Sequence, residues 1–255
     1  MNKVFQSLVN FLVGSLDNLY LFTKQMGVPS YALAIVLLTI IVNIILYPLK
    51  HYQMKSLKKM QDLQPLVKEL DVKYKSDPQK KQQELMELYK QHGANPLTGC
   101  LPMIIQMPIF IALYKALQKM PTSESFINSG PAQAFLWIDN IAVTISKADP
   151  YYIFPILVAV TTYFSQKITM TNSNDPTQKT MLIAMPLLFG FMTISFPAGL
   201  AIYWVTFSLV GAVQQVFINK TTKTLPISLP EPVKEEVKKN DDRKNDGRKN
   251  GKNRR

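Results

Sequence analysis

An uncharged apolar run at residues 31–49 constrains the fold of this chain more than any other feature. An α-helix rises about 1.5 Å per residue, so the run spans roughly 28 Å, close to the thickness of one hydrocarbon core. Asn43 lies near the middle of the run. An amide without a hydrogen-bond partner in hydrocarbon costs roughly a few kcal/mol, so we expect Asn43 to face other helices or a wet cavity rather than lipid.

Four further apolar segments follow, and together they predict an all-α polytopic membrane protein with five transmembrane helices. The fourth segment is the shortest: its apolar part covers only roughly 21 Å, so the bilayer must thin there or the helix must include flanking residues. The expected spans are residues 30–50, 96–118, 151–167, 180–195 and 198–218.

The segment before the first span, residues 1–29, has the pattern of an amphipathic helix. Its polar stripe is unbroken, which favours a helix lying in the extracytoplasmic interface over a spanning one. The apolar face consists of Val4, Phe5, Leu8, Leu12, Leu16, Leu19 and Tyr20.

Residues 51–95 are predicted to form a cytoplasmic helical hairpin. Apolar residues recur at steps of three and four along the first arm, and Pro65 should kink that arm or reset its start. Between the arms, Asp77 can cap a second helix whose first position is Pro78. Residues 119–150 should form an extracytoplasmic loop, and residues 168–179 a cytoplasmic one.

The formal net charge of +12 is concentrated in the hairpin and in the tail, residues 219–255. With the N-terminus outside and the C-terminus in the cytoplasm, 24 of the 29 Lys and Arg residues lie on the inner side, as the positive-inside rule requires. The tail has the composition of a disordered segment. Its charge suggests anionic lipid or an RNA-bearing partner.

Chemistry-bearing patterns are scarce in the sequence. The single cysteine, Cys100, has no partner for a disulfide, and two histidines, His51 and His92, make no metal cluster. No Gly-rich phosphate loop or His-Glu-x-x-His pattern occurs. We therefore expect no catalytic residue, no metal and no cofactor, and we do not expect an enzyme.

Between residues 31 and 220 the sequence resembles the YidC membrane-protein insertases, a bacterial family with mitochondrial and chloroplast relatives. The resemblance implies a five-helix core with a hydrophilic groove that is open to the cytoplasm and lipid and closed towards the outside. It rests on these motifs: Tyr47-Pro48-Leu49, Asn95-Pro96-Leu97, Gly99-Cys100-Leu101-Pro102, Gln106-Met107-Pro108-Ile109-Phe110, Asp149-Pro150-Tyr151-Tyr152-Ile153-Phe154-Pro155, Asp175-Pro176, Phe196-Pro197-Ala198-Gly199-Leu200 and Tyr203-Trp204.

The resemblance also implies the site residues. Asn43, Gln106 and Thr162 would line the client groove, and Met107, Phe110 and Trp204 would form a slide for the client's hydrophobic segment. Members of the family usually carry an arginine where this chain has Asn43, so the substitution removes a fixed positive charge from the groove. Asn43 has two readings: a wet groove-lining amide, or a helix–helix hydrogen bond to Gln106 or Thr162.

The function that the resemblance implies is a membrane-protein insertase and chaperone in the bacterial inner (plasma) membrane. It would receive nascent membrane proteins and release their transmembrane segments laterally into the bilayer. The ribosome, bound through the basic tail, the general translocation channel and a targeting factor are the further expected partners; DNA is not. A small-solute or ion transporter and a membrane-bound assembly scaffold are the alternatives.

Overall fold

The computed structural model describes residues 3–95, 101–169 and 176–221. These residues form helices and turns, and among them the only β-type pairings are two isolated bridges. This confirms the all-α fold class. The longer helices are α1 (Lys3–Gln25), α2 (Tyr31–Ile45), α3 (Tyr47–Asp62), α4 (Gln64–Lys73), α5 (Pro78–Gln91), α6 (Leu101–Lys119), α9 (Ile153–Thr169), α10 (Pro176–Thr193) and α11 (Ala198–Thr221).

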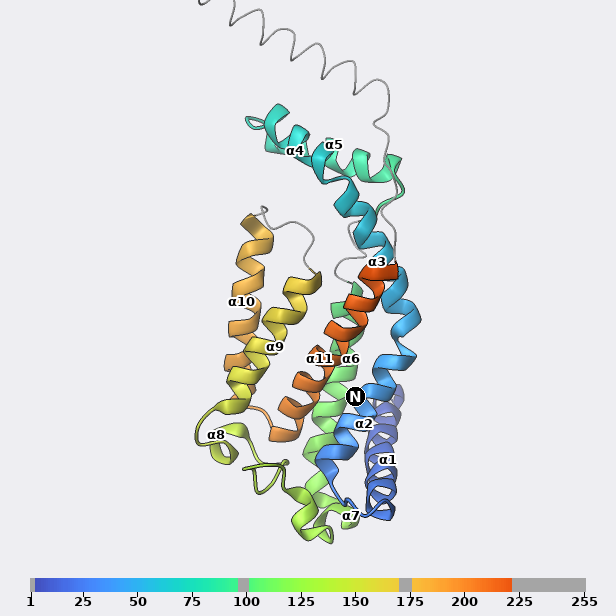
Figure 1. Ribbon diagram of the computed structural model, residues 1–255, viewed down its shortest axis with the longest axis vertical. Helices are drawn as coiled ribbons and strands as arrows, with labels where there is room; N and C mark the ends of the chain where they lie inside the picture. Colours follow the sequence, from blue (N-terminus) through green and yellow to red (C-terminus); the bar gives the residue numbers. More distant parts are fainter. Residues whose placement is uncertain (1–2, 96–100, 170–175, 222–255) are drawn as a thin grey trace, which may run out of the picture. The chain divides into compact units, whose positions relative to one another are not determined.

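Helix α11 is central to the packing. It contacts α2 on one side and α9 on the other, and it also contacts α6 (Figure 1). Helix α10 packs against α9, and α1 packs against α2 and α6. The chain therefore brings α2, α6, α9 and α11, which are far apart in sequence, around one interior.

Helices α2 and α3 are separated by a bend of 56°. The side chain of Ser30 caps the start of α2 by accepting a hydrogen bond from the backbone N–H of Leu33. The bend coincides with Pro48, which has no N–H to donate to the carbonyl of Ile44, so the regular helical ladder is interrupted there. The predicted first span is thus a bent pair of helices rather than one straight helix.

One face of α1 packs onto the bundle. Tyr20 stacks on Tyr31 with ring centroids 4.2 Å apart, and the Tyr31 hydroxyl donates a hydrogen bond to Asp17 at 2.9 Å. Leu12, Leu16 and Tyr20 are buried, as the predicted apolar face requires, whereas Val4, assigned to the same face, is 76% exposed. The interfacial position of residues 1–29 remains a prediction.

Helices α9 and α10 approach closely at Gly190. A Cβ atom added there would lie 3.0 Å from the carbonyl oxygen of Pro155 and 3.1 Å from the Cβ of Ala159. A glycine suits this position because a side chain there would press on the backbone of α9.

Residues 120–152 form short helical turns, including α7 (Glu124–Ile127) and α8 (Ile145–Ala148), instead of one long helix. Asp149 fixes the end of this segment. Its buried carboxylate accepts hydrogen bonds from the Trp137 indole at 3.0 Å and from the backbone N–H of Phe154, in the first turn of α9, at 2.7 Å.

Helices α4 and α5 pack against each other as the predicted hairpin. Pro65 lies in the first turn of α4, so the proline restarts the helix rather than kinking it. The carboxylate of Asp77 accepts a hydrogen bond from the Lys80 backbone N–H at 3.0 Å, which confirms the predicted cap of α5. Lys81 and Asp71 form an ion pair between the two arms at 2.7 Å.

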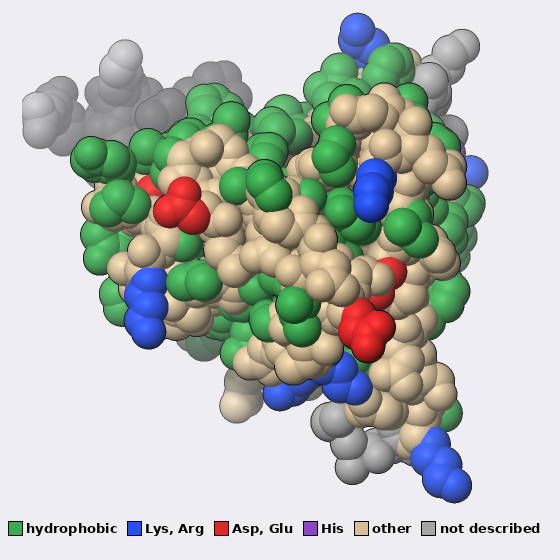
Figure 2. Space-filling view, turned by 90° about the horizontal axis from the view of Figure 1, so that it is seen from below, with side chains coloured by type: hydrophobic (Ala, Val, Ile, Leu, Met, Phe, Trp, Pro, Cys, Tyr) green, Lys and Arg blue, Asp and Glu red, His purple; other side chains and the backbone are tan. Residues whose placement is uncertain are grey.

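By length and hydropathy, one helix among the described residues could cross a membrane alone: residues 198–220 of α11. The bent pair α2–α3 passes the same test when taken together, and Lys179–Thr193 of α10 is apolar but shorter. The five-span count remains a prediction. Seen from the α7 end, the surface carries few charged side chains among many hydrophobic ones (Figure 2). The basic tail, Cys100 and part of the 168–179 loop lie outside the described residues.

Candidate polar site between the apolar helices

The buried side chains of the bundle change from apolar to polar along its length. The first halves of α2 and α11 and the second half of α6 contribute an apolar core near α7. Beyond this core, buried polar residues replace aliphatic ones on the same helices. They are Thr39 and Asn43 on α2, Thr162 on α9, and Ser208 and Gln215 on α11. The apolar core therefore ends part-way along these helices, and buried polar side chains follow it on α2, α9 and α11.

Asn43 is completely buried, and its amide is satisfied within the chain. Its Nδ2 donates a hydrogen bond to the Thr39 carbonyl oxygen at 2.8 Å, and its Oδ1 accepts one from the Lys50 ammonium at 2.6 Å. Its backbone carbonyl accepts a further bond from the Gln214 amide at 3.1 Å. One of the two readings from the sequence was a hydrogen bond to Gln106 or Thr162; Asn43 instead bonds Thr39, Lys50 and Gln214.

Lys50 brings a positive charge to Asn43. Its Nζ also donates a hydrogen bond to the Gln214 side-chain oxygen at 3.2 Å and lies 4.6 Å from the centre of the Phe207 ring. We call Asn43, Lys50, Phe207 and Gln214 the Lys50 cluster. From the resemblance, an asparagine at position 43 removes a fixed positive charge from the groove. In the structure, a lysine seven residues later places its ammonium 2.6 Å from the Asn43 side-chain oxygen.

A second cluster brings together Thr162, which the sequence assigned to the client groove, and Phe110 and Trp204, which it assigned to the slide. The Trp204 indole donates a hydrogen bond to the Thr162 hydroxyl at 2.9 Å. The Trp204 ring packs edge-on against Phe110 with centroids 5.3 Å apart, and it lies 4.4 Å from Phe189. Thr162, Trp204, Phe110 and Phe189 form what we call the Trp204 cluster. Met107 is 43% exposed on the surface of α6.

Gln106 lies on α6 and donates a hydrogen bond from its side-chain amide to the hydroxyl of Tyr203 on α11. The contact ties α6 to α11 through two polar groups. Gln106 is half-buried and Tyr203 is buried.

Sequence reasoning missed Lys50, Phe207, Tyr203 and Gln214. Lys50 follows the Tyr47-Pro48-Leu49 motif at the end of an apolar run, where a lysine ordinarily extends to the headgroups. Gln214 and Gln215 could have indicated a polar site, because two adjacent amides in a helix with long apolar stretches need hydrogen-bond partners. What could not be seen is that the Lys50 side chain runs back to Asn43 and meets Gln214 of α11 there.

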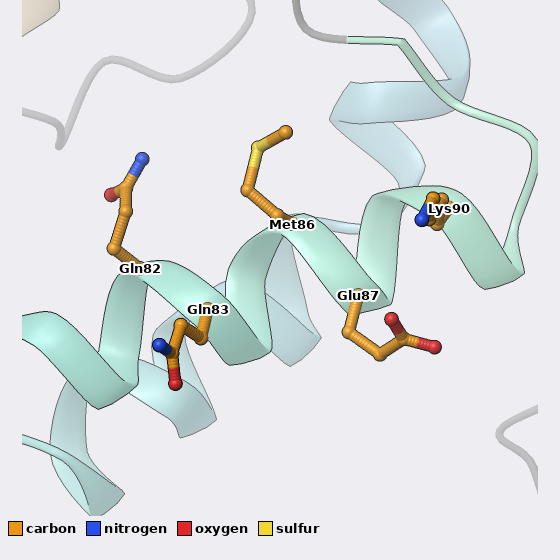
Figure 3. Close-up of a pocket in the computed structure, with 5 residues that line it drawn as sticks. All are labelled: Gln82, Gln83, Met86, Glu87 and Lys90. Atoms are coloured by element: carbon orange, nitrogen blue, oxygen red, sulfur yellow. The ribbon is translucent and has the colours of Figure 1, made fainter.

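A pocket of about 360 Å³ lies elsewhere, on α5 of the hairpin (Figure 3). Gln82 and Met86 project from one side of α5, and Gln83 and Glu87 from another, so the polar groups do not converge. Across the described residues, no group of three or more His, Cys, Asp or Glu side chains could hold a metal ion.

Apolar helices that bury polar side chains next to a half-buried lysine, and that expose many large aliphatic and aromatic side chains, define a helical membrane protein with a polar interior site. The model of the 60Kd inner membrane protein family matches residues 21–225. The chain belongs to this family, which places it in a membrane and confirms the resemblance found in the sequence.

Relatives in this family are named membrane protein insertase YidC. The protein of that name from Helicobacter pylori strain J99 is 42% identical over 86% of this chain and 37% of its own length. The one from Wolinella succinogenes is 44% identical over 81% of this chain and 36% of its own length. The chain thus spans about a third of the length of these curated relatives.

A solved structure shows the same fold. The crystal structure of an active YidC insertase with its first transmembrane domain resolved has a TM-score of 0.64 and 31% sequence identity to this chain. The match covers 87% of this chain and 48% of the solved one.

Proposed function

We propose that this protein is a membrane-protein insertase: it receives nascent membrane proteins in the polar part of its interior and releases their transmembrane segments sideways into the bilayer. The observation that carries the proposal is the set of buried polar side chains on α2, α9 and α11, which follows the apolar core along these helices. The names of the relatives support the same activity.

The mechanism needs no covalent step. Polar side chains on α2, α9 and α11 give the polar part of a client hydrogen-bond partners part-way across the membrane, which lowers the cost of removing it from water. The exposed apolar surfaces of α6 and α9 then guide the client's hydrophobic segment into lipid, because transfer of apolar surface from water is favourable.

Met107, Phe110 and Trp204 are the proposed slide. Phe110 and Trp204 pack on each other, and Met107 is exposed on the preceding turn of α6. A methionine adapts its shape to different partners, and aromatic rings offer a large apolar area. Gln106 and Thr162 are held by Tyr203 and Trp204, and a client could replace these partners as it passes.

We extend the proposal to topology and partners. The N-terminus lies outside and the C-terminus in the cytoplasm, in keeping with the distribution of Lys and Arg. The basic tail binds the ribosome through rRNA phosphates, and such binding weakens steeply with added salt. The hairpin is the proposed contact for a targeting factor or the general translocation channel.

The test is reconstitution of the purified chain into protein-free vesicles, followed by addition of a short single-span client. Insertion above that of empty vesicles, without leakage of a trapped dye, is expected. Insertion no greater than in empty vesicles contradicts the proposal, and solute flux without client insertion indicates a transporter. Photocrosslinkers at positions 110 and 204 should capture the client during insertion, whereas one at the buried Phe126 should not.

A further inference from the structure

The segment between α7 and α9 contains two turns in which a bulky residue has a positive φ angle. Leu136 has a φ of 55° and Tyr152 a φ of 52°, in the left-handed region that favours glycine. No other non-glycine residue in the described part of the chain has a positive φ. A bulky side chain in this region strains the backbone, and such strain persists where a function requires it.

The first turn is a two-residue hairpin with an apolar tip. The backbone N–H of Phe135 donates a hydrogen bond to the Ile138 carbonyl at 2.8 Å, and the Ile138 N–H returns one at 2.9 Å, so Leu136 and Trp137 form the tip. A positive φ at the first tip residue alone is the pattern of a type II′ turn, in which glycine is usual there. Leu136 is 72% exposed, so packing within the chain does not offset its strain.

The second turn consists of Tyr151 and Tyr152, directly before α9. The Tyr152 N–H donates a hydrogen bond to the Asp149 carbonyl at 3.1 Å. Trp137 joins the two turns, because its indole N–H bonds the Asp149 carboxylate and its ring lies 5.4 Å from the ring of Phe154. The two turns thus hold four large exposed side chains around Asp149. We call them the anchor cluster: Leu136, Trp137, Tyr151 and Tyr152.

The composition and position of the anchor cluster indicate lipid as its partner. Tryptophan and tyrosine are enriched at membrane–water interfaces, because each combines an apolar ring with one hydrogen-bonding group. The cluster also continues an exposed apolar row of α9, since Ile156 and Val160 follow Tyr152 at steps of four residues. Viewed from the α7 end, hydrophobic side chains project from a surface with few charges (Figure 2).

The segment that carries the cluster is fixed to the end of α10. The backbone N–H groups of Ile145 and Ser146 donate hydrogen bonds to the carbonyls of Phe196 and Ile194, in the turn after α10, at 2.9 and 3.1 Å. Helices α9 and α10 have 17 and 18 residues, or about 26 Å and 27 Å, which is shorter than a hydrocarbon core of roughly 30 Å. The depth of such short helices depends on interfacial anchors at their ends.

We propose that the anchor cluster inserts into the lipid interface at this end of the bundle and sets the depth of α9 and α10 in the bilayer. The Leu136 side chain reaches the acyl chains, and the rings of Trp137, Tyr151 and Tyr152 lie at the level of the headgroups. The partner is the bilayer itself rather than a second protein. The proposal goes beyond the insertase function and does not depend on it.

The test measures membrane depth with a nitroxide label on the full chain in vesicles of phosphatidylcholine and phosphatidylglycerol, at high lipid excess. The label is placed by Leu136→Cys or Tyr151→Cys in a chain that also carries Cys100→Ser. Asp139→Cys, at an exposed polar position of the same segment, is the control. Oxygen, which concentrates in lipid, should relax the labels at 136 and 151 more than a water-soluble nickel chelate does. The label at 139 should show the opposite order.

Leu136→Asn separates the anchor from a purely structural role. Asparagine tolerates the left-handed region better than leucine, so the substitution relieves strain while it removes the apolar side chain. Helix content by circular dichroism should not change, but the label at 151 should move towards water. Leu136→Met, which stays apolar, should keep the label at its original depth. Ile127→Asn, at an exposed position of α7 outside both turns, is the matched control and should not move it.

Three results would overturn the proposal. A label at 136 that the nickel chelate reaches as easily as one at 139 would mean that the cluster faces water. A label at 136 shielded from both reagents would mean that it contacts protein, such as a second copy of the chain. A Leu136→Asn variant that loses helix content, or that leaves the label at 151 unmoved, would make Leu136 a residue of the fold alone. None of these results depends on client insertion.

Discussion

The indole nitrogen of Trp204 and the hydroxyl of Thr162 are joined by a 2.9 Å hydrogen bond that links α11 to α9. The sequence assigned Thr162 to the polar groove and Trp204 to the apolar slide, yet the two side chains are in contact. The polar and apolar surfaces offered to a client therefore meet at this pair. A client that displaces Trp204 from Thr162 exposes a hydroxyl and an indole N–H at the same time.

The substitution Thr162→Val should destabilise the protein by about 1 kcal/mol, because it keeps the shape of the side chain and leaves the Trp204 N–H without an acceptor. Thermal unfolding in detergent measures the effect. Thr161→Val is the control, since the Thr161 hydroxyl bonds only carbonyl oxygens of its own helix. A loss of equal size in both variants would mean that the contact between helices contributes nothing.

Replacing Asp149 should destabilise the segment between α6 and α9. Asp149→Ala removes the acceptor for the Trp137 indole and for the Phe154 backbone N–H, at a cost of about 2–3 kcal/mol. Asp149→Asn retains one acceptor oxygen and should cost less. Asp139→Ala, at an exposed position ten residues earlier, should be nearly neutral by the same unfolding measurement. Similar losses at positions 139 and 149 would contradict this account.

Adding a methyl group at Gly190 and at Gly211 should have opposite effects. Gly190→Ala forces the new Cβ against the Pro155 carbonyl oxygen and Ala159, so overpacking should cost about 1–2 kcal/mol after the gain in helix propensity. At Gly211 the added Cβ would have no atom within 4 Å apart from its chain neighbours and the adjacent backbone of its own helix, so Gly211→Ala should stabilise by up to about 1 kcal/mol. Melting temperatures that shift in the same direction would refute the close approach of α9 and α10.

Removing the cap of the hairpin should loosen its second arm locally. Asp77→Ala should cost about 1 kcal/mol and increase amide hydrogen exchange in the first turn of α5, at Lys80 above all. Ser76→Ala changes an exposed neighbour and serves as the reference. Unchanged exchange at Lys80 would show that the cap does not hold this turn.

Residues that act on the adjacent backbone, such as caps and prolines, allowed much of the secondary structure to be predicted. Asp77 and Pro78 act through their own backbone neighbours, so the start of α5 could be read from the sequence. Pro65 restarts a helix for the same local reason. The apolar face of α1 was predicted only in part: Phe5 and Leu8 pack against the core, whereas Val4 is 76% exposed, because periodicity does not say which apolar residues a partner helix covers.

The resemblance named residues for the candidate site, but the sequence did not give their contacts. Asn43, Gln106 and Thr162 are polar residues in apolar helices, and that much is visible in the sequence. Their partners Lys50, Tyr203 and Trp204 depend on how α2, α3, α6, α9 and α11 meet. No local rule gives the distance between residues that are 164 positions apart, such as Lys50 and Gln214.

The sequence by itself determined that the chain is helical, that its apolar runs belong in a membrane, and that a polar amide at position 43 needs a partner. These conclusions follow from composition and periodicity, which act within a few residues. Only the tertiary structure decided which partner it is. The Lys50 side chain runs back to Asn43, and packing of α11 against α2 brings Gln214 and Phe207 to the ammonium, so a positive charge lies beside Asn43.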